Sequence, residues 1–136
     1  MKTDEEIKTD VYRVIVGSEL QRAITGKVSK RKRPHNSGNE DIVISVLANE
    51  NGQIQTASVN VNIFVQDEYI DGQPEEKTIR IKELCKMAET LFDVFSGDGF
   101  RARLLSQRVL ENEGTAGQPV PEHVINNKIE YKFNNE

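Results

Sequence analysis

The chain has 136 residues, enough for one hydrophobic core and too few for two, so we expect a single domain over residues 1–136. A net charge of −4, a single cysteine and the lack of a long apolar run argue against a general polyanion binder, an internal disulfide and a membrane protein. No charged and apolar leader pattern opens the chain, so a reducing cytoplasm is the expected location.

The chain opens with the pattern of an amphipathic helix. Thr3 and Glu6 have capping-box spacing, and apolar residues recur at helical intervals, which together predict a helix over residues 4–16. A further apolar-faced turn precedes Gly26, which is expected to end it. Residues 27–33 are almost wholly polar and predict an edge strand or an arm with little burial.

Strand patterns follow the polar segment. Residues 34–41 have the composition of a loop, and residues 42–47 (IVISVL) predict a short β-branched strand. The pair Asn51-Gly52 is a hairpin signal. Residues 57–66 then alternate apolar with polar or outward-facing positions, which predicts the clearest strand of the chain.

A second helix is predicted in the middle of the chain. Residues 67–77 break the strand pattern with turn formers, and helical spacing then runs over residues 81–95. We expect this helix to end near Gly97. The sequence Gly97-Asp98-Gly99 follows a helix and precedes a strand, which is the reverse of a phosphate-binding loop, so it is interpreted as a helix C-cap and turn.

The last third of the chain predicts two more strands, over residues 100–110 and 128–133, separated by a flexible loop over residues 111–122. The element order α-β-β-β-α-β-β lacks the alternation that builds parallel sheets. We therefore predict an α+β fold: an antiparallel sheet of four to five strands with two helices packed on one face. Its expected core joins Val59, Val61 and Ile63 to Leu84, Ala88 and Leu91.

Reactive residues are few and scattered. Cys85 lies on the apolar face of the second predicted helix, which favours a small buried thiol over a nucleophile. His35 and His123 fall in predicted loops, without the spacing of a metal-ligand set, and are expected at the surface. We therefore predict no enzyme, and no catalytic, cofactor-binding or metal-ligating residue.

The basic run KVSKRKR, residues 27–33, leaves two interpretations open. It offers phosphate contacts to a nucleic acid, but no aromatic residues interleave it for base stacking and the whole chain is acidic. The alternative is an ion-pair surface between subunits, in which this run meets acidic residues of a neighbour. The predicted subunit-interface residues are Lys30, Arg31, Lys32, Arg33, Glu75, Glu76, Glu111 and Glu113.

Taken as a whole, the chain resembles the tail-completion, or tail-terminator, proteins of long-tailed bacteriophages, a group that includes minor tail and head-to-tail joining proteins. The likeness covers most of residues 4–133 and lies in the segments EEIKTDVYRVIVGS, IVISVL, ASVNVNIFVQD, IRIKELCKMAETLF and VINNKIEYKF. The polar residues 27–33 and the long loop over residues 111–122 depart from the family pattern.

The resemblance implies a structural protein that forms a ring, often a hexamer, at the end of the tail tube and presents a surface to the head connector. It implies no cofactor, no small-molecule substrate and no catalysis, and a location in the bacterial host cytoplasm during assembly and then in the virion. A small nucleic-acid-binding module that uses residues 27–33 is the alternative. An enzyme remains only if a partner completes a site.

Overall fold

The computed structural model describes residues 1–112 and 121–135. Its helices are α1 (Asp4–Ile15), α2 (Glu19–Ala23) and α3 (Thr78–Phe92). Its strands are β1 (Val28–Ser29), β2 (Ile42–Glu50), β3 (Ile54–Gln66), β4 (Glu68–Ile70), β5 (Gln73–Glu75), β6 (Val94–Gly97), β7 (Phe100–Asn112) and β8 (Glu122–Asn134).

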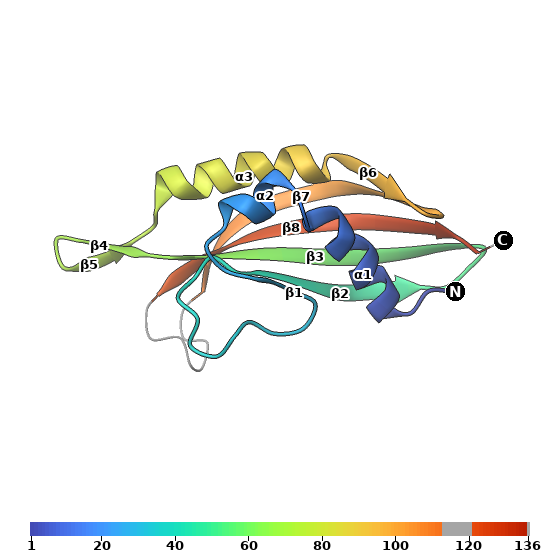
Figure 1. Ribbon diagram of the computed structural model, residues 1–136, viewed down its shortest axis with the longest axis horizontal. Helices are drawn as coiled ribbons and strands as arrows, with labels where there is room; N and C mark the ends of the chain where they lie inside the picture. Colours follow the sequence, from blue (N-terminus) through green and yellow to red (C-terminus); the bar gives the residue numbers. More distant parts are fainter. Residues whose placement is uncertain (113–120, 136) are drawn as a thin grey trace.

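The fold is α+β, with one large sheet covered on one side. The sheet has six strands in the order β1-β2-β3-β8-β7-β6, and β4 and β5 form a separate two-stranded hairpin. All neighbouring strands of the sheet run antiparallel except β1, which is parallel to β2. The three helices lie over one face of the curled sheet, and within residues 1–112 and 121–135 no helix covers the other face (Figure 1).

The core lies between the helices and the sheet, where the sequence predicted it. Val59, Val61 and Ile63 of β3 are fully buried, and Leu84 and Ala88 of α3 are fully buried opposite them. Leu91 is half-buried and packs against the same cluster. The period of two along β3 and the helical period along α3 each turn one apolar face inward, which is why the pairing could be predicted.

Helix α1 begins where its capping residues predicted. The Thr3 hydroxyl accepts a hydrogen bond from the Glu6 backbone N–H at 3.2 Å, and the Glu6 carboxylate accepts one from the Thr3 backbone N–H at 3.1 Å. Both bonds satisfy backbone donors that the first turn leaves free. Ile7, Val11 and Ile15 then form one buried stripe along the helix.

The second predicted helix ends earlier than expected. Helix α3 ends at Phe92, and Val94–Gly97 forms strand β6, which pairs with β7. The prediction counted Phe95 in the helical stripe because of its spacing. Its ring is buried, but from strand β6, where it packs on Phe100 with centroids 6.3 Å apart. The following Gly97-Asp98-Gly99 is therefore a hairpin turn instead of a helix C-cap, with Gly99 at a φ of 77°.

The strand count and one pairing also differ from the prediction. The sheet has six strands instead of four to five, and the edge strand β1 pairs in parallel with β2, which the all-antiparallel prediction did not allow. Three helices form instead of two, because the turn before Gly26 stands alone as α2. Of the predicted loop over residues 111–122, Glu111 and Asn112 belong to β7 and Glu122 to β8, and residues 113–120 lie outside the described residues.

A hairpin arm occupies the segment that was expected to be only a break. Strands β4 and β5 pair across a turn at Asp71 and Gly72, which have positive φ values of 53° and 78° as a tight hairpin requires. The arm, residues 68–75, extends away from the end of β3 (Figure 1). Every residue in its strands is exposed, so the arm contributes nothing to the core.

Candidate functional site

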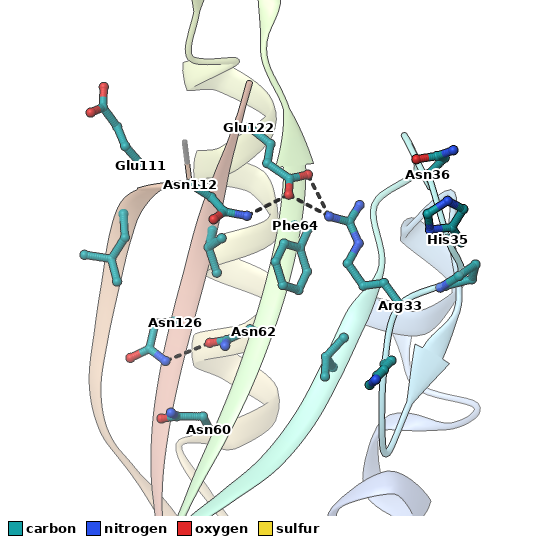
Figure 2. A pocket seen from close by; sticks show the side chains of 15 residues that line it. Arg33, His35, Asn36, Asn60, Asn62, Phe64, Glu111, Asn112, Glu122 and Asn126 are labelled. Atoms are coloured by element: carbon teal, nitrogen blue, oxygen red, sulfur yellow. Dashed lines mark hydrogen bonds and ion pairs between the residues drawn. The ribbon is translucent and has the colours of Figure 1, made fainter. Parts of the chain in front are cut away.

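The uncovered face of the sheet carries a groove of about 790 Å³ near the base of the arm. Alternation along β3 explains its floor: because Val61 points into the core, Asn60 and Asn62 point to the opposite face. Strands β7 and β8 extend the floor, and the loop before β2, which includes His35, forms one wall. Figure 2 shows Asn62 and then Asn60 below Phe64, with the Arg33 side chain to one side of them.

The groove combines amide groups with a few apolar surfaces. The Asn126 side chain of β8 donates a hydrogen bond to the side-chain oxygen Oδ1 of Asn62 of β3 at 2.7 Å. This bond joins the two strands across the floor. Phe64 and Val124 add apolar surface nearby. Side-chain amides offer both donors and acceptors, so this floor suits an extended polypeptide with its own backbone groups.

Arg33 closes one end of the groove and is the centre of a polar network. Its side chain is only 9% exposed, and its guanidinium donates to both carboxylate oxygens of Glu122, at 2.7 and 2.8 Å, and to Asp41 at 3.1 Å. The same group lies 4.2 Å above the ring of Phe64. An arginine that is bonded to two carboxylates and stacked on an aromatic ring is held in one geometry.

The partners of Arg33 are themselves fixed. Asp41 accepts a hydrogen bond from the Lys27 backbone N–H at 2.9 Å, and Glu122 accepts one from the Asn112 side chain at 2.8 Å. Gly26 leaves room for this packing, because a Cβ there would lie 2.7 Å from the backbone oxygen of Glu40. The network thus ties the segment after α2 to β2 and β8.

The structure separates the four predicted basic interface residues into two groups. Lys30 forms an ion pair with Glu5 of α1 at 3.0 Å, and this contact lowers the pKa of the Glu5 carboxyl. Arg33 is engaged inside its own chain, contrary to the little burial expected for this segment. Only Arg31 and Lys32 are exposed, and Lys32 lines the groove.

The predicted acidic residues lie near one another. Glu75 in the arm, the half-buried Glu76 and the exposed Glu111 all line a second hollow of about 310 Å³. Glu111 also lines the groove, so the two hollows adjoin. Glu113 lies outside the described residues.

The two histidines differ, and the prediction was wrong about one. His35 is an exposed loop residue as expected, whereas His123 belongs to β8 and its Nδ1 lies 2.6 Å from a carboxylate oxygen of Asp67. The run of turn formers before His123 concealed the start of that strand. Cys85 is half-buried against the core, and burial raises the pKa of its thiol, which favours the unreactive protonated form.

Several residues of this site were missed by sequence reasoning. Asp41 and Glu122 were assigned to loops without a role. The alternation over residues 57–66 did place Asn60 and Asn62 on the face opposite the core, but it gave no sign that β8 would supply Asn126 beside them.

Within residues 1–112 and 121–135, no group of three or more His, Cys, Asp or Glu side chains is arranged to hold a metal ion. In the same residues, no helix combines the length and apolar character needed to cross a bilayer. No family model and no curated protein matches this chain.

Proposed function

We propose that this chain is a structural subunit that forms a ring at the end of a bacteriophage tail tube and joins the tube to the head connector. The proposal rests on the resemblance described above, and the observation that carries it is the β4–β5 arm. The tail tube protein and the head connector are then its partners, with a further contact between copies of the chain itself. No cofactor and no catalytic step belong to this proposal.

The arm is a feature that an isolated subunit does not need. Tyr69 and Ile70 are 61% and 48% exposed, and no residue of either arm strand is buried. A lone two-stranded hairpin is marginally stable in water, and exposed strand edges invite pairing with another chain. An exposed arm with large apolar side chains is therefore best explained by a partner that covers it.

The nucleic-acid alternative loses part of its basis in the same structure. Of the basic run, Lys30 and Arg33 already pair with Glu5, Asp41 and Glu122 of their own chain. Within residues 27–33, the exposed positive charges are then those of Lys27, Arg31 and Lys32. Such a small patch favours a limited protein contact over a phosphate track.

Sedimentation velocity and electron microscopy of the purified chain test the proposal. We expect a concentration-dependent closed oligomer that appears as rings and weakens at high salt, and capping of polymerised tail tubes when the tube protein is added. A chain that stays monomeric at every concentration, with or without tube protein, and binds DNA with a steep salt slope would overturn it.

A charge-reversal pair sharpens this experiment. Because Arg31 and Lys32 are exposed, changing both to Glu should leave the fold intact while weakening the oligomer. Lys82 and Lys86 are exposed on α3, on the covered side of the sheet, and their change to Glu is the matched control. Equal effects of the two pairs would mean that the basic run has no specific role in assembly.

A further inference from the structure

We propose that the β4–β5 arm of one copy lies in the open-face groove of a second copy, so that each subunit gives its arm to one neighbour and receives the arm of another. This inference rests on the proposed function, because it names the contact by which that ring would close. The arm and the groove lie at the same end of the molecule but on different surfaces. A contact between two different surfaces is heterologous and generates a ring or a filament.

Charge favours this pairing. The arm, residues 68–75, carries Glu68, Asp71 and Glu75 and contains no lysine or arginine, so it is strongly acidic, and Glu76 follows it directly. The groove is bordered by the exposed Lys32. At its end, Arg33 is shared between Glu122 and the buried Asp41, so this cluster keeps one net negative charge, and Glu111 at the rim adds a second opposing charge.

Strand register adds two more positive charges to the same face. Arg108 lies directly opposite Asn126, and Lys128 lies directly opposite Asn60, so both side chains share the face of the groove. Neither side chain forms an ion pair with another residue in the described part of the chain. An acidic segment is therefore the protein surface that this face fits best.

The shape and chemistry of the two surfaces also correspond. The arm presents Tyr69 and Pro74 side by side, since they pair directly across its strands. The groove offers Leu110, which is 39% exposed, as apolar surface beside the Phe64 ring, and its asparagine side chains can bond to backbone groups of an extended segment. Seating Tyr69 in the groove would remove the exposed ring from water and give the marginal hairpin its missing support.

Thiol cross-linking between two differently marked copies tests the contact. Cys85→Ala removes the only natural thiol, and one copy then carries Pro74→Cys, beside the intact Tyr69, while a second, larger tagged copy carries Asn60→Cys. A short bis-maleimide should join the two copies into a mixed dimer. Because each chain has one thiol, such a product can arise only between copies.

The matched control uses the same strand and the same face. Ile54 is 53% exposed, and its six-residue separation from Asn60 along β3 places it about 20 Å away on the open face. We expect Pro74→Cys to join Asn60→Cys at least about tenfold faster than it joins Ile54→Cys. Equal rates, or no mixed dimer with either, would overturn the inference.

A second variant separates this inference from the proposed function. Tyr69→Ser should weaken the oligomer about tenfold or more and leave the melting temperature unchanged, since the arm is outside the core. If wild type forms rings but neither the cross-link nor the Tyr69→Ser effect is seen, the rings close by another contact. If wild type forms no oligomer at all, the proposed function fails together with this inference.

Discussion

The two faces of β3 are built from alternate residues of one strand and yet are held by different forces. Val59 and Val61 are fully buried under the helices, where apolar burial stabilises them without requiring a particular direction. Asn60 and Asn62 are half-buried on the other face, where they meet polar side chains and a charged loop. The covered face therefore sets the fold, and the open face is the one to which we assign the proposed contact with another copy.

The largest effect is expected from putting a charge on the covered face. Val61→Asp should unfold the chain, because an unpaired buried carboxylate costs several kcal/mol, comparable with the whole stability of a domain. Asn60→Asp, one residue away on the open face, is the matched control and should melt near the wild-type temperature. Circular dichroism against temperature makes the comparison, and a soluble Val61→Asp protein with a cooperative transition would contradict it.

The next largest loss of stability is expected from removing the ion pairs of Arg33 on the open face. Arg33→Ala should reduce the free energy of unfolding by about 3–5 kcal/mol, because it leaves Asp41 and Glu122 buried without their cation. Urea unfolding measures the loss. Lys32→Ala changes the adjacent exposed residue and should cost less than about 0.5 kcal/mol.

A double variant shows whether that loss of stability comes from the carboxylates that are left without a cation. Adding Glu122→Gln to Arg33→Ala removes one unpaired charge, so part of the lost stability should return. No recovery would assign the loss to Asp41 or to the other contacts of Arg33, which are the Phe64 ring and two backbone oxygens of the loop before β2.

The covered face could be predicted from sequence because its signals are local. Alternation predicts the strand face of Val59, Val61 and Ile63. The spacing of Thr3 and Glu6 predicts a helix start within four residues. Phe95 shows the limit of such patterns. A buried ring is compatible with a helix or a strand, and only the pairing of Val94–Gly97 with β7 decides between them.

The open face could not be predicted because its contacts join distant segments. Arg33 meets Glu122 across 89 positions of sequence, and the meeting depends on where β8 begins and on its register with β3. The hairpin arm was missed for another reason. The sequence showed the turn formers Asp71 and Gly72, but each flanking strand has three residues, which is too short to show an alternating pattern.

The smallest effect is expected from an exposed polar contact, at the cap of α1. Hydrogen bonds from the Thr3 backbone N–H and hydroxyl hold the pKa of Glu6 below its ordinary value of 4.5. Stability from a lowered folded-state pKa is present above the unfolded-state pKa and is lost as pH falls through the folded-state pKa.

Glu6→Gln keeps an acceptor but cannot titrate, so wild type should melt about 2 °C higher at neutral pH and lose that advantage below about pH 4. Glu50→Gln removes the same charge from an exposed strand position and should show no such pH-dependent difference. A Glu6→Gln difference that persists unchanged in acid would mean that the cap does not depend on the ionised carboxylate.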